Sequence, residues 1–259
     1  TPSTVIGGNS SVGTVTLTSK AAPGGYVVAL SSDNPAITVP AEVTVAEGET
    51  TATFPVDYDV VADDSNGVVT AQLNGSSKTS NVTVKAANIT SLGLSKTSTA
   101  GGNDVTGTVT IDGMAPAGGL TVTLSSSNPK VVVPASVTIL EGMTEATFTA
   151  PTVSTAVATD VTVTASARGV VLNKGITITA PVVVSVVSNP ASITGSNTGT
   201  ATVTLDGPAP SSWVVTIASD NPALGFGLVA GVQVATKTTA VATGARSVNV
   251  SMTTAYVTA

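Results

Sequence analysis

An internal repeat constrains this chain more than any other feature of its sequence. The best-preserved unit runs from Gly107 to Phe148, and the same unit stands 94 residues earlier. The matched positions are Leu17 and Ile111, Leu30 and Leu124, Asn34-Pro35 and Asn128-Pro129, Pro40 and Pro134, Glu47-Gly48 and Glu141-Gly142, and Phe54 and Phe148. A third copy begins on the same schedule at Leu205, with Asn221-Pro222 one residue early. Because the period has the length of an ordinary domain, it predicts successive domains of one fold.

Alternation of aliphatic and polar residues recurs in these units. It is clearest at Thr14–Leu17, Val43–Val45, Asn81–Val84, Val161–Thr164 and Ile176–Ile178. A period of two puts the aliphatic residues on one face of a strand and the polar residues on the other, as in an antiparallel sheet with one face in water. The β-branched residues that dominate these segments also favour strands. No segment keeps a period of 3.6, so we expect an all-β fold with almost no helix.

Turn residues separate these segments. Asn66-Gly67, Asn74-Gly75, Asp112-Gly113 and Asp206-Gly207 are pairs typical of tight hairpins. The recurring Asn-Pro pairs mark one loop that all three units share. About seven strands per unit are expected, which is the count of an immunoglobulin-like sandwich. The core positions predicted in the first unit are Val15, Leu17, Val28, Leu30, Val39, Val43, Val45, Phe54, Val82 and Val84.

The order of motifs in the first unit resembles a known family. Gly13–Leu17 is followed by Ala22–Gly25, Val28–Ser32 and Asn34-Pro35, and then by Val39-Pro40, Val43–Val45, Gly48 and Phe54. This order resembles the bacterial immunoglobulin-like repeat domains of large secreted and cell-surface proteins. The resemblance covers nearly all of the first two units and the first half of the third. It implies tandem β-sandwiches, whereas function stays open because the family serves stalks, adhesins, surface layers and fibres.

The predicted domains are residues 1–86, 87–180 and 181–259. Ile89–Leu94 is the expected first strand of the second domain and Val182–Val187 that of the third, while the first domain has no counterpart. The third domain lacks a stretch corresponding to Val161–Ile178. Two interpretations remain open: the chain is an excerpt of a longer protein or the rest of the domain is disordered, or a neighbouring subunit completes the open sheet by strand addition. The short links near Lys85–Ala87 and Ala180-Pro181 predict a fairly stiff rod.

Composition excludes several classes of function. The net charge is −6 with nine scattered basic residues, which argues against nucleic-acid binding. No run approaches the roughly 18 apolar residues of a membrane-spanning helix. The sequence contains neither Cys nor His, so it offers no disulfide, thiolate ligand, imidazole ligand or Ser-His-Asp arrangement. Glu47 and Glu49 flank a turn, but the second unit has Glu141 and Met143 there. We therefore expect a protein that is not an enzyme.

Three kinds of candidate site remain. Asp57, Asp59, Asp63 and Asp64 form an acidic run that could hold Ca²⁺, although its spacing lacks the EF-hand pattern and a solvated loop is the favoured explanation; no other cofactor is expected. Glycosylation sequons begin at Asn9, Asn74, Asn81, Asn88 and Asn249, about the number that chance gives. The single Trp213 could stack on a sugar, but it keeps the parity of Val215 and Ile217, which predicts a partly buried position.

Together these patterns predict a structural subunit of an extracellular filament, sheath or surface layer, with strand complementation as the candidate way of joining its copies. Its partners would be further copies of itself or neighbouring domains of the same protein, at the cell surface. The alternative is a spacer or binding module of a large adhesin. An accessory region of a polysaccharide-degrading enzyme and a virion decoration protein also fit the fold.

Overall fold

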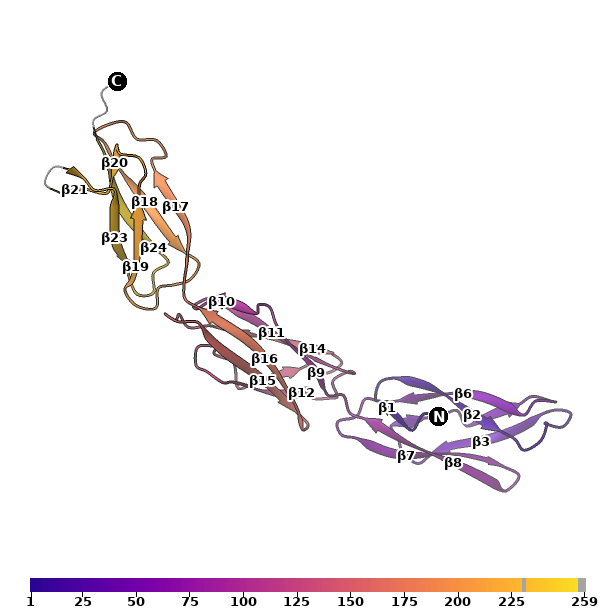
Figure 1. Ribbon diagram of the computed structural model, residues 1–259. Coiled ribbons are helices and arrows are strands. Elements are labelled where there is room, and N and C mark those ends of the chain that lie inside the picture. The colour runs from indigo at the N-terminus through magenta and orange to yellow at the C-terminus, as the bar shows by residue number, and fades with distance from the viewer. Residues whose placement is uncertain (230–231, 256–259) are drawn as a thin grey trace.

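Three β-sandwich domains lie end to end in one bent row (Figure 1). The computed structural model describes residues 1–229 and 232–255, and in this part of the chain every regular element is a strand. The prediction of an all-β fold with an incomplete third domain is therefore confirmed. The described residues include no helix long and apolar enough to cross a membrane.

The first domain has two facing sheets. One has the strand order β1-β8-β7-β3-β5 and the other the order β2-β6-β4. Their bounds are β1 (Thr4–Ile6), β2 (Ser10–Thr16), β3 (Tyr26–Ser32), β4 (Ile37–Thr38), β5 (Glu42–Val45), β6 (Thr51–Tyr58), β7 (Ser65–Leu73) and β8 (Ser76–Lys85). All pairs are antiparallel except β1 with β8, which run parallel.

The second domain repeats this plan with two differences: it adds one strand, and the counterpart of β4 is only an isolated bridge between Val131 and Thr152. Its sheets have the orders β10-β16-β15-β12-β13 and β14-β11-β9. The bounds are β9 (Ile89–Leu94), β10 (Ser98–Ala100), β11 (Val105–Ile111), β12 (Leu120–Ser126), β13 (Ser136–Ile139), β14 (Glu145–Ala150), β15 (Thr159–Ala167) and β16 (Val170–Thr179). The added strand is β9, which pairs with β11 as the predicted first strand of the domain.

The third domain has a four-stranded sheet, β17-β18-β24-β20, and two smaller ones, β19-β23 and β21-β22. The bounds are β17 (Val183–Asn189), β18 (Thr198–Leu205), β19 (Trp213–Ala218), β20 (Leu224–Gly225), β21 (Leu228–Val229), β22 (Val232–Gln233), β23 (Thr236–Val241) and β24 (Ser247–Thr254). Its described residues include no counterpart of β15 and β16. The counterpart of β10 is not a strand either, because β10 pairs with β16 in the second domain.

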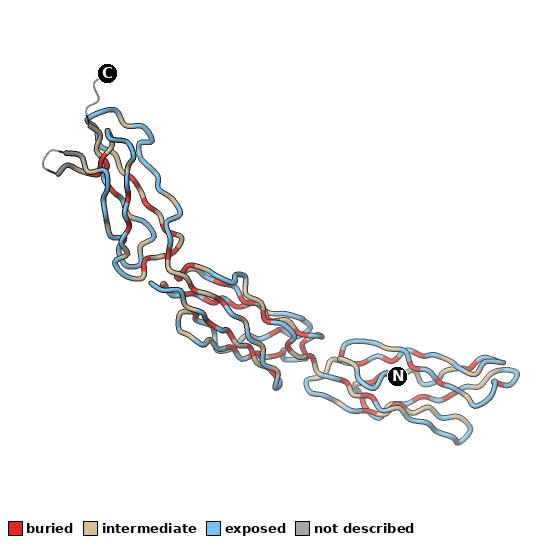
Figure 2. The backbone as a smooth tube through the Cα atoms, in the orientation of Figure 1, coloured by how far each residue is buried: buried red, intermediate tan, exposed pale blue. Residues whose placement is uncertain are grey.

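Each domain has its own hydrophobic core, and red segments that mark buried residues occur in all three domains in Figure 2. Of the core positions predicted in the first domain, seven are buried, while Leu17, Val39 and Val43 are half-buried and pack against them. Trp213 is half-buried against the third core, as its parity predicts. The Asn-Pro loop also recurs: the Oδ1 atoms of Asn34, Asn128 and Asn221 each accept a bond from the N–H two residues later, at 2.9 Å.

A glycine lies beneath an aromatic ring in the first two domains. Gly107 on β11 pairs with Phe148 on β14, and a Cβ at Gly107 would lie 2.1 Å from the ring atom Cζ. Gly13 and Phe54 repeat this arrangement. The third domain has Ala201 opposite Val250, so a larger residue on one strand accompanies a smaller one on its neighbour.

Three of the four predicted hairpin turns are wrong. Asn74-Gly75 does join β7 to β8, with both residues at positive φ as such a turn requires. Asn66-Gly67 instead lies inside β7, where the glycine makes room for Asn34: a Cβ at Gly67 would lie 2.5 Å from the Cβ of Asn34. Asp112-Gly113 and Asp206-Gly207 follow β11 and β18, but the next strands begin only at Leu120 and Trp213. These last two pairs lie between domains.

Candidate functional site: the joints between domains

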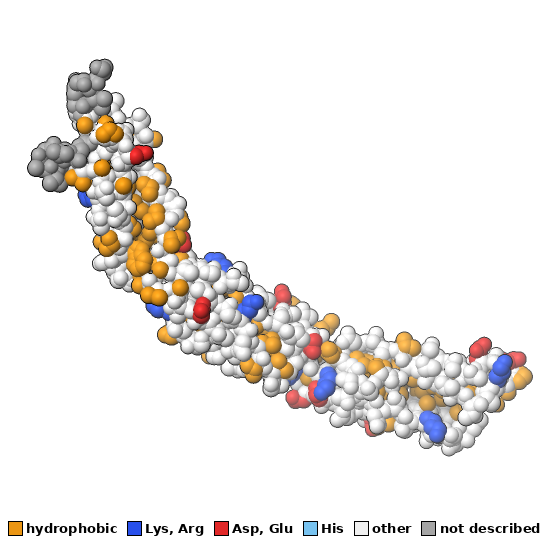
Figure 3. All heavy atoms as spheres, in the orientation of Figure 1, with side chains coloured by type: hydrophobic (Ala, Val, Ile, Leu, Met, Phe, Trp, Pro, Cys, Tyr) orange, Lys and Arg blue, Asp and Glu red, His pale blue; other side chains and the backbone are white. Residues whose placement is uncertain are grey.

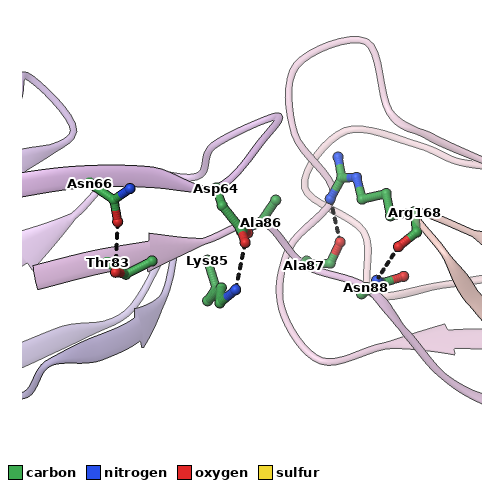
Figure 4. Close-up of polar contacts among 8 residues, drawn as sticks. All are labelled: Asp64, Asn66, Thr83, Lys85, Ala86, Ala87, Asn88 and Arg168. Atoms are coloured by element: carbon green, nitrogen blue, oxygen red, sulfur yellow. Dashed lines mark hydrogen bonds and ion pairs between the residues drawn. The ribbon is translucent and has the colours of Figure 1, made fainter.

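Short polar contacts hold the link between the first two domains (Figure 4). Lys85 Nζ lies 2.5 Å from Asp64 Oδ2, and the Ala86 N–H donates to Asp64 Oδ1 at 3.0 Å. From the second domain, Arg168 Nη1 donates to the Ala87 carbonyl, and Asn88 Nδ2 donates to the Arg168 carbonyl at 3.4 Å. The link is therefore tied to the domain on either side of it.

The Asp-Gly pair of the second domain completes this joint. Asp112 Oδ1 accepts the Asn88 N–H at 2.8 Å, and the Asp112 N–H donates to the Asn88 carbonyl at 3.1 Å. Gly113 then approaches the first domain, where an added Cβ would lie 2.6 Å from Cγ2 of Ile6. Gly113 is required because a side chain would not fit at this close approach, and Asp112 is required because its carboxylate accepts a backbone N–H of the link.

The second joint repeats these contacts. Asp206 Oδ1 accepts the Val182 N–H at 2.8 Å, and the Asp206 N–H donates to the Val182 carbonyl at 3.0 Å. A Cβ at Gly207 would lie 2.9 Å from Cβ of Ala100. Every partner is shifted by the repeat period, since Asn88 and Val182, Asp112 and Asp206, Gly113 and Gly207, and Ile6 and Ala100 are all 94 residues apart. The repeat thus includes the joint as well as the domain.

The second joint has additional bonds that cross between domains. Arg246 Nη2 donates to the Gly102 carbonyl and to Asn103 Oδ1, both at 2.9 Å, and its Nη1 donates to the Asp206 carbonyl at 3.0 Å. Asn103 Nδ2 in turn donates to the Asp206 carbonyl at 3.1 Å. An added Cβ at Gly102 would lie 2.2 Å from Cγ of Pro208. These contacts fix how the third domain sits on the second.

One carboxylate at the first joint, that of Asp64, has a shifted pKa. The hydrogen bond from Lys85, with a smaller contribution from the Ala86 N–H, holds the pKa of Asp64 below its ordinary value of 3.8. Both side chains of this pair are 48% exposed, so solvent screens most of their attraction.

The four aspartates of the acidic run are all exposed, but they are not gathered into one site. Asp57 lies on β6, Asp59 directly follows that strand, and Asp63 and Asp64 precede β7. In the described part of the chain, no three acidic side chains come together in a way that could hold a metal ion. Calcium binding remains a prediction, and the carboxylate of Asp64 is already bonded to Lys85 and Ala86.

The five sequon asparagines occupy different surroundings. Asn74 lies at the exposed tip of the β7–β8 hairpin, and Asn81 is exposed on β8. Asn9 donates to the Ile6 carbonyl, and Asn249 accepts a bond from Thr202 Oγ1, although both are exposed. Asn88 is half-buried in the first joint. Glycosylation remains a prediction at all five.

A second feature of functional interest is the open face of the third domain. Val183, Val184, Val186 and Val187 on β17 are each about half exposed. Hydrophobic side chains are gathered along this domain in Figure 3. Val183, Val186 and Ser188 line a groove of about 430 Å³ whose floor includes Ile217 and Phe226. The place of Val182–Val187 in the repeat predicts the strand but gives no sign that its inner face is uncovered.

No protein-family model matches this sequence, and no curated protein matches it either. Similar solved structures include the adhesin InvE of Yersinia pseudotuberculosis, with 16% identity, a TM-score of 0.33, and coverage of 68% of this chain and 56% of that one. Domains 4 and 5 of the S-layer protein SbsC are 20% identical with a TM-score of 0.29, over 59% and 77%. A tandem of titin domains is 14% identical with a TM-score of 0.40, over 93% and 85%. At such scores the architecture rests on this chain's own strand order.

Proposed function

We propose that this chain is a structural, non-enzymatic module of a cell-surface protein, which sets a fixed distance and direction between its two ends. The observation that carries the proposal is the joint, whose Asp-Gly contacts recur at the repeat period. Contacts of this kind restrict rotation between neighbouring domains, and the domains themselves are separately packed. A rod with repeated joints suits a module that holds other domains at a fixed distance from one another.

The finer proposal is that the module is a subunit of an extracellular filament, sheath or surface layer joined by strand addition. Its support is the open third domain. The groove beside β17 has an apolar floor, and the sheets of this domain, as described, are incomplete. A strand from a neighbouring subunit would cover the exposed valines and pair with the open sheet edge.

Electron microscopy of the native material tests this assembly, with an intact mass measured on the same sample. Regular fibres built from a chain of about this length would support it. A Val186→Lys variant should lose the fibres, because Val186 lines the groove. Val187→Lys is the matched control, since Val187 is similarly exposed on the same strand but does not line the groove. Deleting all residues after Val232 should also abolish assembly.

A spacer in a large adhesin is the second candidate, favoured by the likeness of the two joints. A spacer would stay monomeric, would appear as isolated beaded rods of a much heavier chain, and would bind its target only through another domain. Fibres that persist in Val186→Lys, or a chain that never assembles, would favour this spacer over the subunit.

A further inference from the structure

The first domain has an open sheet edge at β2. In the second and third domains, β11 and β18 each pair with strands on both sides. Their counterpart β2 pairs only with β6 among the described residues. The Leu17 N–H donates to the Thr50 carbonyl, on the side of β2 that faces β6. Backbone groups point alternately to the two sides of a strand, so those of the neighbouring even-numbered residues point away from β6. Thr14 and Thr16 therefore present an edge ready for a further strand.

An apolar groove lies beside this edge. It has a volume of about 320 Å³ and opens between β2 and β8. Its apolar lining consists of Val15, Leu17, Val28, Phe54, Val69, Ala71 and Leu73. Leu17, Ala71 and Leu73 are half-buried, whereas their counterparts Ile111, Ala165 and Ala167 in the second domain are buried. The difference is the cover that β9 provides, since β9 packs against β11 and β16.

The other two domains show what fits such a groove. β9 and β17 are both antiparallel to the strand they cover, in the same register: Leu92 pairs with Val109, and Val186 with Val203. Both ladders also shift register at the same place, so that Ile89 pairs with Ile111 and Val183 with Leu205. Shared register and shared irregularity make the two strands a template for the first domain.

The template has a sequence signature. β9 begins Ile89-Thr90-Ser91-Leu92, and β17 begins Val183-Val184-Ser185-Val186. Each has an aliphatic residue, any residue, a serine and a second aliphatic residue. Shifted by the repeat period, the two aliphatic residues fall opposite Leu17 and Val15 of β2. Both strands of this kind in the described part of the chain are already paired within their own domains.

We propose that the groove between β2 and β8 is a strand-acceptor site. Its occupant is an extended peptide segment with the pattern aliphatic–x–Ser–aliphatic, which runs antiparallel to β2. This segment is neither β9 nor β17, because both of these strands are already paired within their own domains. The inference deepens the proposed structural role and rests on it, because it gives the first domain a strand acceptor of its own, at the opposite end of the module from the groove beside β17, and states what the accepted strand contains.

A synthetic peptide with the sequence of residues 86–95 tests the site on the intact chain. Hydrogen exchange should slow along the open edge, at Val12, Thr14, Thr16 and Thr18, and little elsewhere. The outer two belong to this set because their counterparts Thr106 and Asp112 donate to Ser95 and Asn88, which the peptide contains. At a peptide concentration about 100 times the dissociation constant, the unfolding midpoint of the first domain should rise by about 10 °C. The matched control peptide carries Ile89→Asp and Leu92→Asp and should have no effect. Equal effects of both peptides, or protection elsewhere, would overturn the proposal.

A protein variant checks the edge itself. Thr14→Pro removes one backbone donor from the open edge, where proline is tolerated, and leaves the bonds to β6 in place. It should abolish peptide binding, whereas Thr14→Val should keep it. If Thr14→Pro lowers the stability of the first domain, a second measurement applies: residues 88–94 fused directly before Thr1 should raise the unfolding midpoint, and the same fusion with Ile89→Asp and Leu92→Asp should not.

These outcomes are read on single chains and do not depend on fibre formation. Peptide binding without fibres would support the acceptor site and contradict the subunit proposal. Fibres without peptide binding would do the reverse. Concentration-dependent self-association that the peptide fails to reverse, with protection at Thr14 and Thr16 in the absence of peptide, would show that a second copy supplies the strand by exchange and would overturn the stated source.

Discussion

In the second domain the inner face of β9 is covered by β15 and β16, whereas the equivalent strand β17 of the third domain lies uncovered. Leu92 on β9 is 8% exposed, and Val186, its counterpart on β17, is 54% exposed. Both strands pair with the equivalent neighbour in the same register, and both are rich in aliphatic residues. The comparison shows that a strand's own sequence sets its pairing, while its burial depends on strands far along the chain.

Aspartate substitutions at these equivalent positions should give the largest difference. Leu92→Asp places a carboxylate without a partner in the second core, and we expect a loss of about 4 kcal/mol or more in unfolding free energy. Val186→Asp should cost about 0.5 kcal/mol or less, because the side chain can reach water. Urea denaturation of both variants checks this. Similar losses in the two would mean that β17 is covered in solution.

The glycine–aromatic pair gives the next largest effect. Gly107→Ala should cost about 1–3 kcal/mol, because the new Cβ would lie where the Phe148 ring packs. The double variant Gly107→Ala/Phe148→Val copies the Ala201–Val250 pair of the third domain.

A double-mutant cycle measured by urea denaturation should give a coupling of about 1 kcal/mol or more between these two positions. The single variant Phe148→Val completes the cycle and serves as its control. Additive losses would mean that the third domain tolerates its pair for another reason.

The two joints should respond differently to one substitution. Gly102 and Gly8 both have φ of 86°, so alanine strains both backbones by about 1 kcal/mol. Only at Gly102 would the added Cβ also collide with a neighbouring domain, at Pro208, since Met114 lies 4.0 Å from the corresponding point at Gly8. Gly102→Ala should therefore change the angle between the second and third domains, and Gly8→Ala should leave its joint unchanged. Small-angle scattering and spin-label distances would measure both.

The smallest expected effect is a pH dependence at the first joint. Because the bonds to Lys85 and Ala86 lower the pKa of Asp64 below 3.8, its carboxylate stabilises the folded chain at pH values above 3.8. That contribution is lost as the pH falls through the lowered pKa. Asp64→Asn should thus be slightly less stable than the wild type at pH 6, and the difference should vanish near pH 2. A difference that grows in acid would contradict this assignment. Urea midpoints at the two pH values measure it.

Much of the fold could be predicted because the repeat compares each domain with the others. All five alternating segments are in strands, apart from Leu17, which directly follows β2, and Ile89–Leu94 is β9. The predicted hairpins failed where a glycine serves another purpose. Gly67 makes room for Asn34, and Gly113 and Gly207 make room for the preceding domain. A short motif does not reveal whether its glycine is needed for a turn or for a close approach.

The joints were harder to predict than the strands. Asp112-Gly113 and Asp206-Gly207 recur at the repeat period, which is the one signal that could have separated them from ordinary turns. Arg246 has no counterpart at that period, and its bonds to Gly102 and Asn103 link residues more than 140 positions apart. The open face of β17 depends likewise on strands that the described third domain does not contain.

The parallel pairing of β10 with β16 has a mechanical consequence. The chain enters the second domain through β9, continues directly into β10 and leaves the domain after β16, and β10 and β16 lie side by side over three residue pairs. A pull on the two ends of the domain slides these strands along each other, so their hydrogen bonds carry the load together and must break together. β1 and β8 repeat the arrangement in the first domain. Tension along the rod therefore meets a shear lock in each of these two domains, and the third domain, as described, offers none.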